Sequence, residues 1–555
     1  MLSNKEVSKI FKTLADLMEL HNENAFKAKS YANAAFQLGR VTGHVMEISL
    51  QQLESTQGIG KSVASKIVEL QQTGTMQALE NLYKLTPPGI VEILRIKGLG
   101  GKKVSVIWKE LGVESVGELL YACYENRLTK LKGFGEKTQQ AVITAIEYYQ
   151  SNIGKFHYAT LEMEAYALVD ALKEVLKTEN ISLCGAIRRK CNVIEKIEIL
   201  VGDKNKVGEV QQVEFLQLEN SGNNKLTFKT LNATPVEIYF CKTENFPLEL
   251  FSKTGSEEYV KTILSEIDGN KRYHSEEEIY AAAAKQFVLP ELREESFKLE
   301  IIDQKELVTE ENIRGVVHNH STWSDGKNTI AEMANACIEK GFEYFVISDH
   351  SKTAVYAGGL TNEQVIDQHK EINVLNQKLS PFKIFKSIES DILYDGSLDY
   401  DESILKQFDL VIASIHSNLK MEEEKATARL CKAIENPYTT ILGHMTGRLL
   451  LSRPGYPLDH MKIIEACAAN YVVIEINANP YRLDIDHTWI PYALQKGVMI
   501  SVNPDAHSID GIHDIHYGII SARKGGLTKK MTWNTMSLQE IDSWLIDRKR
   551  KKGIQ

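Results

Sequence analysis

The sequence lacks the long apolar segments and the paired cysteines that define several classes of protein. No apolar run approaches the roughly 20 residues needed to cross a bilayer, so we expect no membrane-spanning helix. The first residues are polar and periodic, without the apolar core of a signal peptide. The seven cysteines are scattered and form no C-x-x-C pair, which predicts reduced buried thiols in a cytoplasmic protein.

The chain also has no excess of positive charge, which argues weakly against a nucleic-acid partner. Its formal net charge is −9, but residues 1–150 contain 18 Lys and Arg against 15 Asp and Glu, which leaves −12 for the remainder. Part of that negative charge falls on carboxylates that are candidate metal ligands. A phosphate-binding N-terminal region is therefore compatible with the composition. The basic segment 548–552 is interpreted as a solvated end rather than a DNA-binding arm.

Glycine turns recur in residues 1–150, which have the pattern of short amphipathic helices. The pattern G-x-G, with an apolar middle residue and a helix after it, occurs three times. Glycines let the backbone approach an anion, and the helix N-terminus offers free N–H groups. One such turn is typical of a simple joint between helices, whereas three followed by lysines favour sequence-independent contact with the DNA backbone. These turns resemble helix–hairpin–helix motifs. Their residues are Gly58, Gly60 and Lys61, Gly98, Gly100 and Lys102, and Gly133, Gly135 and Lys137.

The periodicity changes twice after residue 150. An expected helix over 160–178 precedes strand-like runs that predict a small antiparallel sheet with helices, and residues 251–305 return to a helical pattern. From residue 316 onward strands and helices alternate regularly. Repeated strand–helix units of this kind predict a parallel sheet or a closed barrel.

Nine potential metal ligands lie at or near the ends of predicted strands in this last region. In a strand–helix barrel such ends converge on one face, where active sites form. Nine ligands are too many for one zinc ion, which takes about four, and they suit a cluster of two or three divalent ions of the kind that hydrolyses phosphate esters. The residues are His318, His320, Asp325, His350, Glu389, His416, His444, Asp505 and His507.

The spacing and chemistry of these ligands narrow the choice of metal. His318 and His320 are two residues apart, so on a regular strand they point the same way, and Asp505 and His507 share that spacing. Imidazoles mixed with carboxylates suit Zn²⁺, Mn²⁺ or Fe²⁺ rather than an all-oxygen magnesium site. The other histidines of this region are interpreted as structural (His369, His460 and His487) or remain ambiguous (His513 and His516).

Short segments between 314 and 520 resemble the PHP (polymerase and histidinol phosphatase) domain attached to bacterial X-family DNA polymerases. They are HNHSTWSDG, ISDHS, IESDILYDGSLDY, ASIHS, GHMTGR and NPDAHS. The resemblance implies a distorted (βα)7 barrel that holds three metal ions, usually Mn²⁺ or Zn²⁺, with Glu389 as a bridging carboxylate. Arg448, which follows His444 by four residues, is a candidate phosphate clamp, with a surface salt bridge as the equally weighted alternative.

Residues 1–300 resemble the polymerase part of the same proteins, in KAKSYANAA, CGAIRRKCNVIEKIEILV, SKTGSEEYV and the helical turns. The resemblance places Lys66 at the lyase position, where an amine attacks an abasic sugar, although such lysines are more often solvated. It also implies a nucleotidyltransferase palm whose catalytic residues are altered. The positions that match the polymerase site are Arg188, Lys196, Glu198, Glu237, Gly255 and Ser256.

The altered palm predicts weak or absent nucleotide addition. The family's pair of metal-binding aspartates is matched by Lys196 and Glu198, and the third aspartate by Glu237. A lysine in place of a carboxylate ligand repels a divalent ion, so Mg²⁺ is not expected at the palm. The aromatic pair before Thr254 is replaced by Ser252-Lys253, and a nucleotide-contacting asparagine by Val260.

The sequence therefore predicts a multidomain DNA-repair nuclease. The expected parts are a lyase-like helix–hairpin–helix domain (1–80), a fingers-like one (81–150), a degenerate α+β palm (151–250), a thumb-like region (251–305) and a PHP phosphoesterase domain (306–555). The expected activity is metal-dependent 3′-5′ exonuclease, with abasic-site cleavage as a further possibility, on gapped, single-stranded or abasic DNA. The alternatives are an active gap-filling polymerase with proofreading and a small-molecule phosphatase such as one acting on histidinol phosphate. The oligomeric state is left open.

Overall fold

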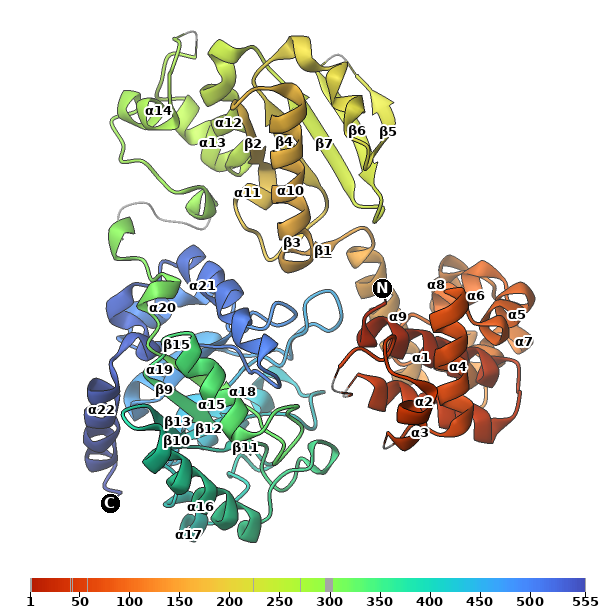
Figure 1. Cartoon of the computed structure of the whole chain (residues 1–555), viewed down its shortest axis with the longest axis vertical. Coiled ribbons are helices and arrows are strands. Elements are labelled where there is room, and N and C mark those ends of the chain that lie inside the picture. Colours follow the sequence, from red (N-terminus) through yellow and green to blue (C-terminus); the bar gives the residue numbers. More distant parts are fainter. Residues whose placement is uncertain are drawn as a thin grey trace. The chain divides into compact units, whose positions relative to one another are not determined.

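The computed structural model describes residues 2–39, 41, 43–56, 58–222, 224–269, 271–294 and 303–554 (Figure 1). Part of the predicted thumb-like region, 295–302, lies outside the described residues. Contacts divide the chain into two units, Met1–Ile153 and Gly154–Gln555. Among the residues that the structure describes, no helix combines the length and the apolar character that crossing a membrane requires.

The first unit is helical. Its helices are α1 (Asn4–Leu20), α2 (Ala25–Leu38), α3 (Leu50–Ser55), α4 (Lys61–Thr73), α5 (Gln77–Leu85), α6 (Pro88–Ile93), α7 (Gly101–Leu111), α8 (Val116–Tyr124) and α9 (Glu136–Asn152). One continuous hydrophobic core runs from Val7 to Ile146. Since α1 packs against α2, α5 and α7, the parts predicted as 1–80 and 81–150 share this core.

The three G-x-G turns adopt one conformation. The first glycine of each has a positive φ, +82° at Gly58 and +89° at Gly98 and Gly133, which only glycine adopts without strain. The second glycine caps the following helix, α4, α7 or α9, and because it has no side chain it cannot itself satisfy the free N–H groups of that helix end. The residue between the glycines is buried in all three turns and anchors the turn to the core.

The second unit begins with the predicted palm. Helix α10 (Tyr158–Leu176) packs on a five-stranded sheet of order β2-β4-β7-β6-β5, with strands β2 (Ile181–Cys184), β4 (Ile197–Val201), β5 (Leu216–Ser221), β6 (Lys225–Thr230) and β7 (Pro235–Phe240). Strands β4 and β7 run parallel, whereas the other pairs are antiparallel. The expected antiparallel sheet is therefore wrong at this pair. Strands β5 and β6 lie between β4 and β7 in the sequence, and after these two antiparallel strands β7 runs in the same direction as β4.

Short elements complete the palm and lead to the thumb-like helices. Strands β1 (Phe156–His157) and β3 (Val193–Ile194) pair with each other, and α11 (Gly185–Arg188) follows β2. The thumb-like helices are α12 (Phe246–Thr254), α13 (Glu257–Leu264) and α14 (Glu276–Ala282). They enclose a small core of their own around Phe251, Ile263 and Tyr280.

The last part of the chain is a closed parallel barrel. Its strands are β8 (Gly315–Asn319), β9 (Tyr344–Ile347), β10 (Lys383–Lys386), β11 (Glu389–Asp391), β12 (Val411–Ser414), β13 (Thr439–Leu442), β14 (Val473–Asn477) and β15 (Ile500–Asn503). They form two sheets, β10-β9-β8 and β11-β12-β13-β14-β15. Parallel bridges between His350 and Glu389 and between Asn319 and Ala506 join the sheets at both ends. Because β10 and β11 follow each other directly, the barrel has seven strand positions, which confirms the predicted distorted (βα)7 fold.

Helices surround these strands (Figure 1). They are α15 (Ile330–Glu339), α16 (Asn362–Leu379), α17 (Glu402–Leu405), α18 (Glu423–Glu435), α19 (His460–Asn470), α20 (Ile490–Gln495), α21 (Ile515–Lys524) and α22 (Leu538–Lys551). Inside the barrel, residues such as Val317, Val346 and Ile412 pack against Trp533, which is fully buried. Burying each aliphatic side chain of this size contributes about 1.5–3 kcal/mol.

The C-terminal helix α22 is part of this packing. Ile541 and Leu545 join the core inside the barrel. Arg548 is buried and donates hydrogen bonds to backbone oxygens, including that of Tyr471 at 2.9 Å. The prediction of a solvated end is therefore wrong for Arg548, because its guanidinium satisfies carbonyl groups at the ends of neighbouring elements.

Candidate metal centre

The barrel brings all nine predicted ligands to the carboxyl ends of its strands. The donor atoms form four groups, and within each group all atoms lie within 4.8 Å of one another. The groups are His320, Asp325, His350 and His507; His318, Glu389 and His444; His318, His320 and Asp505; and His350, Glu389 and His416. Each of the nine residues belongs to at least one group, and four of them belong to two, namely His318, His320, His350 and Glu389.

The backbone at two of these positions departs from a regular strand. His318 has a φ of +64° and Asp505 a φ of +53°, both in the left-handed region that side chains other than glycine rarely adopt. The register of β8 shifts between Val316 and Asn319, so His318 and His320 do not point inward by simple strand alternation as expected. Strain of this kind is concentrated at functional sites, where surrounding contacts hold it in place.

Glu389 is the centre of one half of the cluster. Its carboxylate oxygens lie 2.9 Å from His444 Nε2, 3.0 Å from His350 Nδ1, 3.1 Å from His416 Nε2 and 3.3 Å from His318 Nε2. The Glu389 side chain is 1% exposed. Four imidazoles around one buried carboxylate give this group the geometry of a shared ligand.

Two aspartates organise the other half. Asp505 Oδ1 lies 3.1 Å from His320 Nε2 and 3.6 Å from His318 Nε2. Asp325 Oδ1 lies 3.4 Å from His507 Nε2 and 3.5 Å from His350 Nε2. Two ligands of a tetrahedral zinc ion are separated by about 3.4 Å, given metal–ligand distances near 2.1 Å. The donor spacings therefore fit cations between these side chains.

Buried donor atoms without partners provide an independent test of that fit. His318 Nε2, His320 Nδ1, Glu389 Oε2 and His444 Nδ1 are buried and form no conventional hydrogen bond. A buried polar atom left in this state costs about 1–3 kcal/mol unless something else binds it. Since most of these atoms face the centre of the groups, the donor set fits a cluster of divalent ions.

Two carboxylates that the sequence analysis missed hold ligand imidazoles in place. Glu475 accepts a hydrogen bond from His318 Nδ1 at 2.6 Å, and Asp391 accepts one from His416 Nδ1 at 2.5 Å. Glu475 also accepts from Asn503 Nδ2 at 2.8 Å. Such partners fix the ring so that the other nitrogen is free to bind a metal. A sequence clue was available for Glu475, because this acid interrupts the apolar strand β14.

The electrostatics of the cluster favour charged carboxylates. Although burial opposes it, the neighbouring histidines lower the pKa of Asp325 to about 2 and that of Asp505 well below its usual value. Burial, together with His507 and His350, lowers the pKa of His320 to about 3, so this imidazole is neutral. At His416 burial is outweighed by Glu389 and Asp391, which raise the pKa to about 10. A cation that binds there replaces a proton.

The predicted phosphate clamp Arg448 lies in the same barrel but is engaged by protein groups. Its Nη1 is 2.6 Å from Asp486, its Nε donates to the Arg482 carbonyl at 2.9 Å, and its Nη2 donates to the Leu483 carbonyl. These contacts hold the segment 482–486. A phosphate contact of Arg448 stays a prediction.

The palm residues predicted to replace the polymerase ligands also meet, but they neutralise one another. Lys196 Nζ lies 2.7 Å from Glu237 and 3.4 Å from Glu198, and Lys225 Nζ lies 2.7 Å from the other oxygen of Glu237. Tyr239 donates to Glu237 at 2.5 Å. Burial raises the pKa of Glu237, but these hydrogen bonds outweigh it and hold the pKa at about 2. Ammonium groups occupy the positions beside the carboxylates that a cation would take.

The remaining predicted polymerase residues are tied to the thumb-like helices. Arg188 donates to Glu276 at 2.6 and 3.0 Å, and Arg293 also binds Glu276 at 2.5 Å. Gly255 ends α12, and a methyl group there would lie 2.8 Å from a Val260 carbon. Ser256 caps α13, and its buried hydroxyl has no hydrogen-bond partner among the described residues. Through Arg188 and Glu276 the palm is joined to the thumb-like helix α14.

In the helical unit the predicted DNA contacts face open space. A methyl group added at Gly60, Gly98, Gly100, Gly133 or Gly135 would meet no atom within 4 Å, whereas at Gly58 it would meet Gln37. Lys61 and Lys137 are exposed, and Lys102 is 78% exposed beside Glu19. Lys66 forms a 2.5 Å ion pair with Glu69 and is 25% exposed, so it is less accessible than these lysines.

Comparison with protein families matches the helical unit and the barrel. Residues 2–76 match the helix-hairpin-helix domain, 90–147 match the SAM-like helix-hairpin-helix tandem, and 317–479 match the PHP domain. The barrel alone is 29% identical to a probable phosphatase of Thermoanaerobacter sp. (strain X514), over 42% of this chain and 96% of that protein. A similar match, 26% identical, covers 34% of this chain and 76% of a probable phosphatase of Vibrio campbellii. Fold and site thus define a helix–hairpin–helix protein with a PHP domain.

The whole chain has a relative that unites these parts. It is 34% identical to the DNA polymerase/3′-5′ exonuclease PolX of Bacillus subtilis (strain 168), over 98% of this chain and 99% of that protein. The chain belongs to the PolX family of X-family DNA polymerases with a PHP domain.

Proposed function

We propose that this protein is a DNA-repair nuclease whose barrel hydrolyses phosphodiester bonds with two or three Mn²⁺ or Zn²⁺ ions. The 3′-5′ direction follows that of the Bacillus subtilis relative. Cleavage at abasic sites would be a further activity of the same centre. The helical region 1–150 would hold gapped, single-stranded or abasic DNA, with the palm (151–250) and thumb (251–305) as a binding platform. The observation that carries this proposal is the complete set of nine donors at one end of the barrel.

The side chains of the centre have separable roles in such a reaction. Bound divalent ions would supply hydroxide near neutral pH and stabilise negative charge on the phosphate. Glu389 and the imidazoles around it would fix the positions of the ions, while Glu475 and Asp391 would keep His318 and His416 oriented. Burial of these residues keeps their charges from being screened by solvent.

The rim of the barrel offers a surface suited to a nucleobase. The Tyr356 ring lies 6.2 Å from the His350 ring and is 58% exposed. An exposed aromatic ring beside the reacting phosphate can stack on a base, which is worth about 1–3 kcal/mol. This feature favours DNA over a small phosphomonoester, the substrate class suggested by the names of the phosphatase relatives.

Turnover of two substrates distinguishes these functions. We expect Tyr356→Ala to raise KM for a single-stranded oligonucleotide by roughly tenfold, consistent with the loss of one stacked base. The same variant should leave turnover of p-nitrophenyl phosphate unchanged. Faster hydrolysis of the phosphomonoester than of DNA by the parent protein would favour the phosphatase function instead.

Polymerase activity is proposed to be lost, because Lys196 stands beside the carboxylates that would bind the metal. Primer extension on gapped DNA with Mn²⁺ and nucleotides tests this directly. Template-directed extension that disappears in Glu198→Ala would overturn the proposal and favour a proofreading polymerase.

Digestion of DNA labelled at either end tests the nuclease itself. His318→Ala and Asp505→Ala should abolish metal-dependent digestion without changing DNA affinity. His513→Ala is the matched control, because His513 belongs to the same barrel but is exposed and contacts Lys340. If the His318→Ala/Asp505→Ala double variant digests DNA as fast as the parent, the centre is not the nuclease site.

A further inference from the structure

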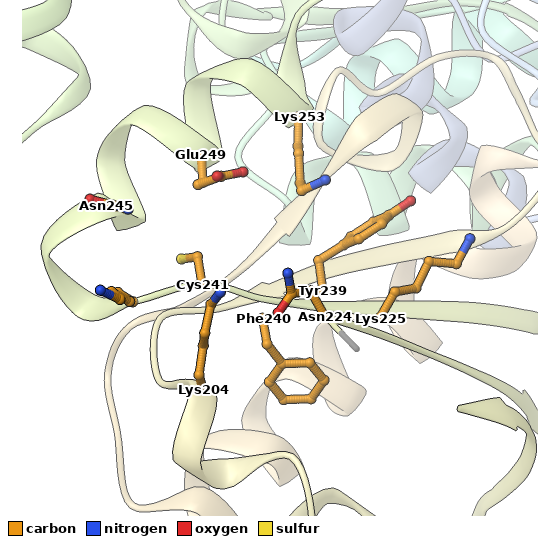
Figure 2. A pocket seen from close by; sticks show the side chains of 10 residues that line it. Lys204, Asn224, Lys225, Tyr239, Phe240, Cys241, Asn245, Glu249 and Lys253 are labelled. Atoms are coloured by element: carbon orange, nitrogen blue, oxygen red, sulfur yellow. The ribbon is translucent and has the colours of Figure 1, made fainter. Parts of the chain in front are cut away.

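A basic pocket lies on the palm beside the altered polymerase residues (Figure 2). Its volume is about 260 Å³. It is formed where β4 and β7 end and α12 begins. Four lysines from different segments line it, namely Lys204, Lys225, Lys242 and Lys253. Figure 2 shows the side chains of Lys204, Lys225 and Lys253 around the space between the sheet and α12.

The charge of this pocket is positive although the chain as a whole is acidic. Glu249 is the only carboxylate among the residues described as lining it. Lys225 is paired with Glu237 at 2.7 Å, which offsets its charge. Within the described part of the chain, neither Lys204 nor Lys242 has a carboxylate within 4.0 Å. Two exposed ammonium groups are therefore available to an anion.

Tyr239 forms a wall between the pocket and the carboxylates of Glu198 and Glu237, which match the metal-binding positions of the polymerase family. Tyr239 donates to Glu237 and lies 3.1 Å from Glu198 with its hydroxyl, while Lys253 Nζ sits 3.8 Å from the centre of its ring. Neither Glu198 nor Glu237 lines the pocket. A ligand bound there would meet the ammonium groups, the amides and one carboxylate, that of Glu249, so its phosphates would face an excess of positive charge without a metal ion.

The size and remaining chemistry of the pocket limit the ligand. Asn224 and Asn245 supply amide groups that can donate to phosphate oxygens, and Tyr239 and Phe240 supply apolar surface. A volume of about 260 Å³ lies just below the usual range for ligand sites and is too small for a DNA duplex. It matches pyrophosphate or a single nucleotide.

We propose that this palm pocket binds phosphate groups of a ligand no larger than a mononucleotide, through lysines and without a metal ion. The ligand is either a free nucleotide or the phosphorylated end of a DNA strand, which present the same chemistry. This site is independent of the nuclease proposed for the barrel, since it shares no residue with it. It would give the altered palm a binding function in place of nucleotide addition.

The test measures binding to the full-length protein in EDTA, which prevents any contribution from metal ions. Pyrophosphate and dATP are titrated calorimetrically, and single-stranded oligonucleotides with a 5′-phosphate or a 5′-hydroxyl are compared by fluorescence anisotropy. We expect Lys204→Gln/Lys242→Gln to weaken binding of the preferred probe at least tenfold. Both lysines are exposed, so the variant should fold normally.

A control variant with the same change of charge is Lys206→Gln/Lys229→Gln. These lysines lie on the same palm but pair with Glu209 and Glu219 outside the pocket. Binding of dATP or pyrophosphate alone would identify a free nucleotide, and a preference for the 5′-phosphorylated strand alone would identify a DNA end. The proposal fails if no probe binds in EDTA, or if pocket and control variants weaken binding equally.

Discussion

The barrel and the palm each gather buried or half-buried carboxylates, but the groups opposite them differ. In the barrel Glu389 and Asp505 face imidazoles, and within the described residues neither pairs with a lysine or arginine. In the palm Glu198 and Glu237 face Lys196, and Glu237 also faces Lys225. An imidazole can lose its proton and become a metal ligand, whereas an ammonium remains a competing cation.

The size of this difference can be expressed as the electrostatic cost of a metal ion beside Lys196. A unit positive charge about 4 Å from a divalent ion is repelled by roughly 8 kcal/mol at an effective dielectric of 20. One lysine therefore outweighs several favourable contacts. The comparison of barrel and palm therefore indicates that the groups paired with the carboxylates of a site predict metal binding better than the number of carboxylates does.

The largest effect is expected from removing the shared carboxylate of the barrel. Glu389→Gln keeps the shape of the side chain but removes the charge that four imidazoles surround. We expect nuclease activity to fall about a thousandfold, because correct placement of more than one ion depends on this residue. Activity and bound metal, measured by elemental analysis, should fall together. The control is Glu339→Gln, an exposed residue at the end of α15. Full activity in Glu389→Gln would show that Glu389 is not a shared ligand.

The second-largest effect is expected from replacing Lys196, the lysine beside the palm carboxylates. In the Glu389→Gln background, Lys196→Asp should create a Mn²⁺ site with Glu198 and Glu237 and tighten palm binding of Mn²⁺ by about a hundredfold or more. Calorimetry measures this binding, and Lys196→Gln separates loss of the ammonium from gain of a ligand. Tight Mn²⁺ binding to the palm before any change at Lys196 would contradict the role given to that lysine.

Sequence patterns predicted the barrel and its ligand positions because both depend on local features. Strands ending in His, Asp or Glu recur at regular intervals, and closure of a parallel barrel brings their ends together. The partners of the ligands were harder to find, since Glu475 and His318 are 157 positions apart and meet only after folding. The pairing of Arg188 with Glu276 and the buried position of Arg548 likewise depend on contacts that no local pattern encodes.

The next-largest effect is expected from the two carboxylates that accept hydrogen bonds from the candidate ligand histidines. Glu475→Gln removes the acceptor that holds His318, and Asp391→Asn does the same for His416. Each should lower metal affinity about 10- to 100-fold while leaving the metal content at saturation unchanged. Titration of activity with Mn²⁺ measures the shift. If saturating Mn²⁺ does not restore activity, these acids take part in more than orientation of the rings.

A smaller effect, on DNA binding rather than on hydrolysis, is expected from substitutions in the G-x-G turns. Gly60→Ala and Gly135→Ala place methyl groups in open space at helix N-termini and leave backbone angles that alanine accepts. Crowding of the approaching phosphate should weaken DNA binding by roughly threefold to tenfold and reduce its salt dependence. Gly117→Ala, which also meets open space but lies outside a G-x-G turn, is the control. Equal effects in all three variants would argue against backbone contact at the turns.

The smallest effect is expected on stability, from a histidine that contacts both the palm and the barrel. His516 on α21 lies 3.1 Å from Glu162 on α10 and 2.7 Å from Glu310. The hydrogen bonds with Glu162 and Glu310 outweigh burial and raise the pKa of His516 to about 9. This contribution to stability is complete below the unfolded pKa near 6.5 and is lost as the pH rises through 9. Because His516 is about one-third exposed, the contribution is at most about 1 kcal/mol. Thermal unfolding of the parent and His516→Gln should therefore differ at pH 6 and converge above pH 9, whereas a constant difference would assign the contact to packing.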